Sequence, residues 1–293
     1  MGALDGRVAI VTGAGRGVGR EHALLFAAEG AKVVVNDLGG EADGSGSDLT
    51  PAQEVVEEIR AAGGEAVVNG DDVADAAGAE RLVRTAIDTF GDLHILVNNA
   101  GILRDRMLVN MSDEEWDVVI RVHMRGHFMP TRAAARYWRE KAKSGAATDA
   151  SVVNTASTSG LFGNVGQTNY GAAKSGMASF TIILQQELER YGVRVNAIAP
   201  AARTRLTQGL GSVSEGEFDQ SDPANIAPFV AYLATKDCPI KGRVFFVYGG
   251  AVHLFQPWAI VDSIDKNGKW TVAELEKQAA HFADVEFDLR KPY

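Results

Sequence analysis

Short apolar runs rich in β-branched residues alternate with longer stretches of helical character along most of this chain. The runs are apolar almost throughout, which is typical of strands that helices bury on both faces. Because parallel strands need long crossovers, this alternation predicts an α/β fold built on a doubly wound parallel sheet with helices on both faces. Seven strands are expected, at residues 7–12, 32–37, 65–71, 94–99, 151–157, 193–200 and 243–250.

The chain has 293 residues, which is long for one domain and short for two. We therefore expect one main domain at 1–250 and a C-terminal helical extension at 251–293. Thr271 in the extension precedes an amphipathic stretch and is expected to be a helix N-cap. The extension is expected to pack on the core or on a partner subunit. A glycine-rich insert at 39–48 is expected to form a mobile surface loop.

Composition excludes several classes of protein. Cys238 is the one cysteine, so an internal disulfide cannot form and a reducing compartment is expected. The formal net charge is −9 and the sequence has no basic tail, which argues against a nucleic-acid partner. The sequence shows neither a signal region at its start nor an apolar run as long as a membrane span. A soluble, cytoplasmic protein that does not bind membranes is expected.

The stretch TGAGRGVGR follows the first strand and carries Gly13, Gly17 and Gly19 at the turn into a helix. Glycine permits a tight turn and a close approach of backbone to a pyrophosphate, and the helix N-terminus favours anions. Arg16 and Val18 belong to the same loop. The strand–glycine turn–helix order predicts a Rossmann-type dinucleotide site at this point.

Asp37 ends the second strand, about 20 residues beyond the glycine turn, where an acidic side chain can accept hydrogen bonds from ribose hydroxyls. A carboxylate there would repel a 2′-phosphate, so NAD is favoured over NADP. Arg16 argues the other way, because a guanidinium in the loop could pair with that phosphate. Asp37 could also be a simple strand-end turn residue.

Tyr170 and Lys174 lie four residues apart in NYGAAKSG, on one face of an expected helix. Free tyrosine has a pKa near 10, too high for an effective base at neutral pH. An ammonium one helical turn away is expected to lower that pKa. Taken alone, the two residues would read as a surface pair.

The chain resembles the short-chain dehydrogenases/reductases in TGAGRGVG, in NNAG at 98–101, and in Ser157 standing 13 positions before Tyr170. Within them it looks most similar to the (3R)-hydroxyacyl-CoA dehydrogenase unit of peroxisomal multifunctional enzymes of type 2 and its bacterial stand-alone relatives. GILRDRM, RVHMRGHF and APAARTRLT carry this closer likeness.

The resemblance implies that Tyr170 is the base, that Ser157 orients the substrate oxygen, and that Lys174 holds the nicotinamide ribose. It also implies a set of further NAD contacts. These are Gly13, Arg16, Gly17, Val18, Gly19, Asp37, Asp72, Val73, Asn99, Ala100, Gly101 and Pro200, with Tyr170 and Lys174.

His123 stands where many family members have an asparagine that supports a proton relay to the lysine. The histidine could serve in that relay, or its ring could pack against the long helix expected at 113–142. His123 and His127 could also bind zinc as an i, i+4 pair. The sequence offers no third ligand, so no metal is expected.

The resemblance favours NAD-dependent oxidation of (3R)-3-hydroxyacyl-CoA. Alternatives are a 17β-hydroxysteroid dehydrogenase, a 3-oxoacyl reductase and, outside catalysis, a silent NAD sensor. Four arginines could bind the phosphates of coenzyme A, or they could be solvated loop charges: Arg104, Arg106, Arg203 and Arg205. Arg203 and Arg205 lie close to Thr207 in the sequence, in a segment expected to form a substrate loop. The resemblance also implies a homodimer or homotetramer that pairs the helices at about 113–142 and 170–190.

Overall fold

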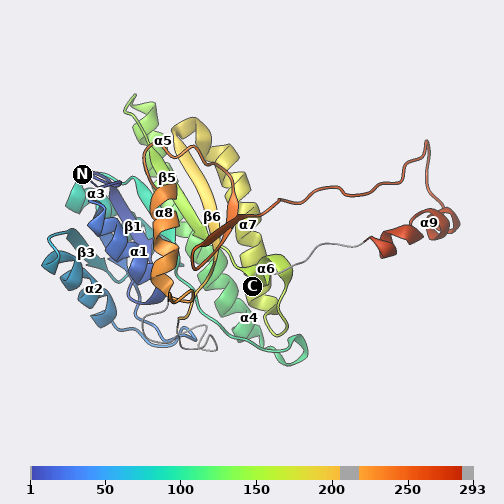
Figure 1. The fold of residues 1–293 in the computed structure, drawn as a ribbon, viewed down its shortest axis with the longest axis horizontal. Coiled ribbons are helices and arrows are strands. Elements are labelled where there is room, and N and C mark those ends of the chain that lie inside the picture. Colours follow the sequence, from blue (N-terminus) through green and yellow to red (C-terminus); the bar gives the residue numbers. More distant parts are fainter. Residues whose placement is uncertain (1, 205–217, 286–293) are drawn as a thin grey trace. The chain divides into compact units, whose positions relative to one another are not determined.

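The protein is described by a computed structural model, which covers residues 2–204 and 218–285. The chain divides into two units, Met1–Leu254 and Phe255–Tyr293. The first unit is an α/β body with one sheet, as the alternation predicted (Figure 1). Its strands are β1 (Val8–Thr12), β2 (Lys32–Asn36), β3 (Glu65–Asn69), β4 (Ile95–Asn98), β5 (Ala150–Thr155), β6 (Val193–Ala201), β7 (Val244–Tyr248) and β8 (Ala251–Leu254).

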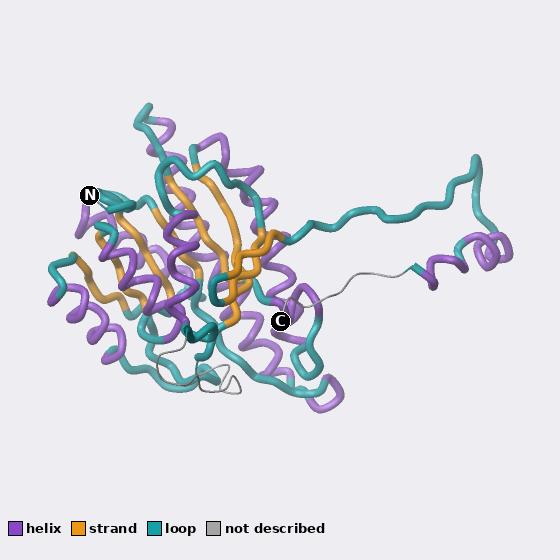
Figure 2. The backbone as a smooth tube through the Cα atoms, in the orientation of Figure 1, coloured by secondary structure: helices purple, strands orange, loops and turns teal. Residues whose placement is uncertain are grey.

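The strands lie in the order β3-β2-β1-β4-β5-β6-β7-β8. All neighbours from β3 to β7 are parallel, with Val8 opposite Lys32 in β1–β2 and Ala150 opposite Val193 in β5–β6. The strand order reverses between β1 and β4, and ligands of such sheets bind outside the carboxyl ends of the strands at that point. Figure 2 shows the strands side by side between helices.

The sheet has eight strands in the described residues rather than the expected seven. The eighth, β8, runs antiparallel to β7, and Tyr248 pairs with Ala251 across the turn Gly249-Gly250. Gly249 has a φ of 53°, which a two-residue hairpin turn requires. This glycine pair was expected to end the last strand, although two adjacent glycines are also a hairpin signal.

Helices cover both faces of the sheet, as expected (Figure 1). Alternate strand residues feed two apolar cores: Val11 and Val33 pack with α1, α2 and α8, whereas Ile10 and Val34 pack with α3, α5 and α7. The helices are α1 (Gly17–Ala28), α2 (Thr50–Ala61), α3 (Ala76–Phe90), α4 (Asp113–Ile120), α5 (Gly126–Lys143), α6 (Thr158–Phe162), α7 (Thr168–Leu188), α8 (Ala227–Leu233) and α9 (Val272–Gln278). Single 3₁₀ turns occur at Leu108–Asn110, Glu189–Tyr191, Pro223–Ile226 and Ala280–Asp284.

The long helix expected at 113–142 is divided in two. A π-helical turn at Arg121–Arg125 lies between α4 and α5. Such a turn carries an extra residue and changes which side chains face inward. It places His123 inside the protein, with 1% of its surface exposed. Hydrophobic periodicity could not have located this local change.

The insert at 39–48 contacts the loop that follows β4. Leu103 N donates to Ala42 O at 3.1 Å, and Arg104 pairs with Asp43 at 3.3 Å. The insert is thus held beside the carboxyl ends of the strands.

In the second unit, Thr271 caps α9 as predicted. Its hydroxyl accepts from Glu274 N at 3.3 Å, and a Glu274 carboxylate oxygen accepts from Thr271 N at 2.7 Å. This reciprocal arrangement is a capping box. That the extension packs on the core or on a partner subunit stays a prediction.

His22 on α1 is fully buried, and neither ring nitrogen has a hydrogen-bond partner within the described parts of the chain. Burial lowers the pKa of His22 from 6.5 to about 3. Below about pH 6.5, His22 is therefore protonated in the unfolded chain but stays neutral in the folded protein. The free energy of unfolding falls as the pH falls because of this residue. His22→Leu should remove that part of the slope, about 2 kcal/mol between neutral pH and about pH 5.

Urea unfolding at the two pH values would measure this effect. His253→Gln is the control, because His253 lies exposed on β8 and its replacement leaves every buried histidine in place. An unchanged slope in His22→Leu would contradict the prediction.

Candidate functional site

The glycine turn joins β1 to α1 in a space too tight for other side chains. A Cβ on Gly13, whose φ is 63°, would lie 2.7 Å from Ala100 Cα, and one on Gly19 would lie 2.1 Å from Gly13 O. Arg16 is the N-cap residue of α1 but makes no capping hydrogen bond through its side chain, and the first turn contains no acidic residue. The N–H groups at this end of α1 are therefore suited to an anion.

Asp37 follows β2 and faces the glycine turn. Its Oδ2 accepts from Gly15 N at 2.8 Å, and its Oδ1 accepts from Gly39 N at 2.7 Å. Two backbone hydrogen bonds fix the carboxylate beside the turn, while its remaining lone pairs can still accept. Gly17 and Val18 open α1 a few residues further along.

The expected contacts after β4 form a joint with β1. Asn99 Nδ2 donates to Thr12 O at 3.0 Å and to Gly13 O at 3.1 Å, and Ala100 N donates to Thr12 Oγ1 at 3.1 Å. A Cβ on Gly101 would lie 2.5 Å from the His123 ring. These contacts hold the β4 loop against the glycine turn. Thr12 was not among the expected site residues, although a polar residue at the end of an apolar strand is a usable signal.

Asp72 and Val73 follow β3, and both already contact other parts of the protein. The Asp72 carboxylate accepts from Ala74 N at 2.8 Å and pairs with Arg121 at 2.6 Å. Val73 is buried and lies beside Gly126, where α5 begins. Asp72 therefore stabilises the segment after β3 and connects it to Arg121.

Ser157 and Tyr170 come together although β5, α6 and the following loop separate them in the chain. Ser157 is the N-cap residue of α6, and its hydroxyl accepts from Ser159 N at 3.2 Å. The Ser157 hydroxyl lies near the Tyr170 phenol and, as a potential hydrogen-bond donor, favours a lower pKa for it. Two groups able to hold one substrate oxygen thus lie beside the carboxyl end of β5.

Lys174 lies one turn beyond Tyr170 on α7 and is 1% exposed. Its Nζ donates to Thr155 O at 2.5 Å and lies 5.7 Å from the centroid of the Tyr170 ring. The predicted stacking of phenol and amine is therefore present, with the amine fully buried and the phenol partly buried.

The expected lowering of the Tyr170 pKa by Lys174 is not found. Burial raises the pKa of Tyr170, a hydrogen bond from Ser157 opposes that rise, and the carboxylate of Asp105 adds to it. Burial also lowers the pKa of Lys174 to about 7, since an ammonium loses hydration there. Desolvation of both partners outweighs their attraction, which spacing in the sequence cannot show.

His123 packs against Tyr170 edge-on, with ring centroids 5.0 Å apart and an interplanar angle of 86°. Its Nε2 lies 2.8 Å from Ile102 O and 3.2 Å from Ile102 N, and Nδ1 has no partner among the described residues. Burial, and next the charge of Lys174, hold the pKa of His123 well below its usual value. The ring is neutral at physiological pH, and its part in a relay stays a prediction.

Asn98 Nδ2 donates to Thr131 Oγ1 at 2.8 Å and to Asn154 Oδ1 at 2.9 Å. Asn154 in turn donates to Thr181 Oγ1 at 3.0 Å. This buried chain of amides and hydroxyls ties β4 and β5 to α5 and α7.

Two further residues position the start of α7, and the sequence analysis missed both. Asn169 Nδ2 donates to Arg104 O and to Glu115 O, each at 3.0 Å. Gln167 Nε2 donates to Asp105 Oδ2 at 2.8 Å. Both lie just before Tyr170, so they fix its helix against the loop that follows β4.

The structure places Pro200 in β6, paired with Val247. The described arginines of the expected coenzyme A set each have a carboxylate partner: Arg104 pairs with Asp43, Arg106 with Glu115 at 3.1 Å, and Arg203 with Asp219. Arg205 and Thr207 lie outside the described residues. These pairs weaken the arginines as free phosphate ligands.

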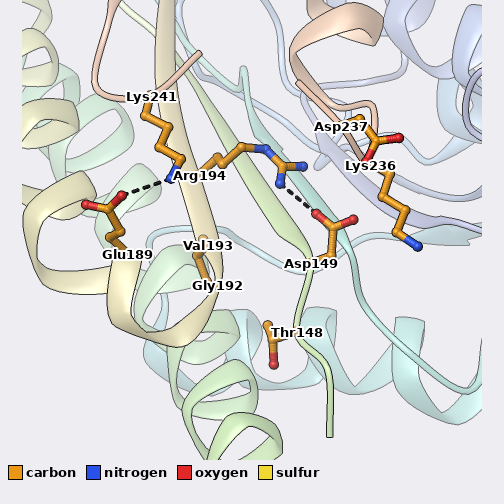
Figure 3. Close-up of a pocket in the computed structure, with 9 residues that line it drawn as sticks. All are labelled: Thr148, Asp149, Glu189, Gly192, Val193, Arg194, Lys236, Asp237 and Lys241. Atoms are coloured by element: carbon orange, nitrogen blue, oxygen red, sulfur yellow. Dashed lines mark hydrogen bonds and ion pairs between the residues drawn. The ribbon is translucent and has the colours of Figure 1, made fainter. Parts of the chain in front are cut away.

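A polar pocket lies at the amino ends of β5, β6 and β7, whereas the residues described so far lie at the carboxyl ends of strands. Figure 3 shows the side chains that line this pocket. Arg194 pairs there with Asp149 at 2.7 Å, and Lys241 with Glu189 at 2.9 Å. The lining residues are Thr148, Asp149, Glu189, Gly192, Val193, Arg194, Lys236, Asp237 and Lys241. This pocket is therefore separate from Ser157 and Tyr170.

The sequence pattern of the short chain dehydrogenases matches residues 7–215. The chain belongs to the short-chain dehydrogenase family. It is 45% identical to the hydroxyacyl-CoA dehydrogenase ChsB1 of Mycobacterium tuberculosis over 284 residues, covering 93% of this chain and 87% of that protein.

This short-chain dehydrogenase is also 47% identical over 238 residues to the peroxisomal multifunctional enzyme type 2 of Drosophila melanogaster. That match covers 81% of this chain and 38% of the fly protein. A crystal structure of a short chain dehydrogenase from Mycobacterium avium superposes with a TM-score of 0.87 at 50% identity, covering 97% of this chain and 96% of that one.

Membership makes this short-chain dehydrogenase an oxidoreductase that acts on a CH–OH group of a small molecule. The family typically uses a nicotinamide cofactor. None of the helices in the described ranges has the length and apolar character needed to cross a membrane. Nor do the described side chains form a group of three or more potential metal ligands.

Proposed function

We propose that this short-chain dehydrogenase oxidises (3R)-3-hydroxyacyl-CoA to 3-oxoacyl-CoA with NAD. The observation that carries the proposal is the placement of Ser157 beside Tyr170, with Lys174 buried one helical turn away, 5.7 Å from the Tyr170 ring centroid. The likeness to ChsB1 and to the type 2 multifunctional enzyme supports an acyl-CoA substrate.

In this proposal Ser157 donates a hydrogen bond to the substrate oxygen and orients the carbinol. Tyr170, in its ionised phenolate form, takes the hydroxyl proton as the C–H bond breaks. A bound nicotinamide cofactor would supply the acceptor of the hydride. Lys174 holds its proton below about neutral pH and loses it as the pH rises, because burial lowers its pKa to about 7. Turnover should therefore depend on pH in the neutral to alkaline range.

The residues present fit a dinucleotide. The turn at Gly13 and Gly19 has no room for a Cβ, and the N-terminus of α1 has no side-chain cap that would compete with a phosphate. Asp37 is held where a ribose hydroxyl donor could meet it. Its negative charge favours NAD over NADP.

Replacing Asp37 by Ser should raise the KM for NAD about tenfold to a hundredfold and shift preference toward NADP, because the change removes a charged acceptor and a phosphate-repelling group. Initial rates with each nucleotide would measure the shift. Glu54→Gln, on the exposed side of α2, is the control for loss of one negative charge. An unchanged preference would remove Asp37 from the cofactor site.

Coenzyme A phosphates could be met by Arg104, Arg106 or Arg203, if each exchanged its carboxylate partner for phosphate. Exchange is feasible for exposed pairs, which contribute little to stability. The side chain of Arg106 is 55% exposed and that of Arg104 is 31% exposed. Arg106 is therefore the best placed of the three.

We also propose a homodimer or homotetramer through α5 and α7. Phe128 on α5 is 38% exposed and Ile183 on α7 is 52% exposed. Large apolar side chains on outward helix faces are typical of subunit contacts. Light scattering of the purified protein would test this assembly.

The deciding experiment follows NADH absorbance with (3R)- and (3S)-3-hydroxyacyl-CoA of equal chain length and with a 17β-hydroxysteroid. Turnover of the (3R)-thioester supports the proposal. Steroid turnover alone would favour a hydroxysteroid dehydrogenase, and reduction of 3-oxoacyl thioesters alone would favour a reductase. Nucleotide binding without any turnover would favour the silent sensor.

A further inference from the structure

Two buried basic side chains, Lys174 and His127, lie near the main-chain carbonyl of Thr155. Thr155 ends β5, two residues before Ser157. Its oxygen accepts from Lys174 Nζ at 2.5 Å. The imidazole of His127 lies near the main chain of Asn98 and of Thr155.

His127 lies in the first turn of α5 and is 1% exposed. Neither of its ring nitrogens has a hydrogen bond of acceptable geometry to any residue the structure describes. One turn further along α5, Thr131 accepts from Asn98 Nδ2 at 2.8 Å, which fixes α5 against the end of β4. The ring is thus held beside two carbonyl-bearing strand ends without being bonded to them.

An imidazole kept in this state needs an explanation, because buried polar groups are nearly always paired. Burial, and next the charge of Lys174, lower the pKa of His127 well below its usual value, so the ring is neutral. A neutral imidazole carries one N–H donor and one acceptor. The donor is available, while Lys174 occupies the Thr155 carbonyl, one of the two carbonyls near the ring.

We propose that His127 is a positioning residue for Lys174. Its N–H takes over the Thr155 carbonyl when the lysine ammonium moves to a bound nicotinamide ribose. The inference rests on the proposed function, since only nucleotide binding would draw the lysine away. Without His127, that movement would leave a buried carbonyl unpaired, which opposes nucleotide binding.

The test compares His127→Leu, which fills the space without a donor, with His127→Gln, which retains an N–H donor. Calorimetry gives the Kd for NAD, and thermal unfolding without nucleotide reports the fold. His127→Leu should weaken NAD about tenfold with no loss of thermal stability, and His127→Gln should stay within about threefold of the wild type. Equal affinity in all three proteins, or equal weakening in both variants, would overturn the inference.

A second measurement needs no variant. In ¹⁵N spectra of the wild-type histidines, NAD should move one ring-nitrogen signal of His127 toward that of a hydrogen-bonded N–H. An unmoved signal in protein saturated with NAD overturns the inference and leaves the proposed function intact. If the wild type binds neither NAD nor NADP, the proposed function and this inference both fail.

Discussion

Tyr170→Phe should lower kcat for alcohol oxidation by about 10³-fold or more while NAD still binds. The substitution removes the group proposed to accept the hydroxyl proton, and positioned proton transfer contributes about 10²- to 10⁴-fold. The ring contact with His123 and the helix remain, since phenylalanine keeps the ring that packs there at 5.0 Å. The thermal midpoint should change little.

Initial rates and calorimetric NAD titrations would separate chemistry from binding. Tyr232→Phe is the matched control, because Tyr232 lies on α8 with 44% of its surface exposed. It should keep the wild-type kcat. A Tyr170→Phe enzyme with more than about a tenth of the wild-type kcat would show that another group accepts the proton.

Lys174→Met should abolish most turnover and yet stabilise the fold. The pKa of Lys174 is about 7 in the folded protein against 10.5 in the unfolded chain. The penalty for burying the charge is at most about 5 kcal/mol. Loss of the hydrogen bond to Thr155 O offsets about half of it. The free energy of unfolding should therefore rise by about 2 kcal/mol near neutral pH.

The stability gained by Lys174→Met should depend on pH. Between about pH 7 and 10.5 the unfolded chain holds the lysine proton and the folded protein does not, so the lysine makes stability rise with pH. The advantage of Lys174→Met should thus be largest near pH 7 and shrink by about pH 9. Urea unfolding at both values would measure it.

Lys143→Met is the control for a lysine lost from the surface, since 61% of the Lys143 side chain is exposed at the end of α5. Its unfolding free energy should follow the wild type at both values. A Lys174→Met protein less stable than the wild type near pH 7 would show that the hydrogen bond outweighs desolvation. A stabilised and inactive Lys174→Met variant would be the usual sign of a site selected for chemistry.

Local patterns in the sequence were sufficient for several features. Alternating apolar strands and helices indicated the doubly wound sheet, since burial on both faces requires continuous apolar runs. The glycines at 13 and 19 indicated a tight turn, and the Cβ clashes at both positions agree. Thr271 was recognisable as a cap because its partner Glu274 lies three residues away.

Features that depend on contacts distant in the chain escaped sequence reasoning. The π-helical turn that buries His123 has no periodic signal of its own. Asp105 lies far from Tyr170 in sequence, but Gln167 brings its carboxylate toward the phenol. The carboxylate partners of Arg104 and Arg106 likewise come from other loops or helices.

The sequence by itself determined the fold class, the place of the glycine turn between the first strand and the first helix, and the spacing that puts Tyr170 and Lys174 on one helix face. Only the tertiary structure decided that both side chains are desolvated, which reverses the expected direction of the Tyr170 pKa. It also decided that His127 stands beside the carbonyl that Lys174 holds. The physical reason is that spacing along a helix sets which groups are neighbours, whereas their charge states depend on how much water the rest of the fold removes.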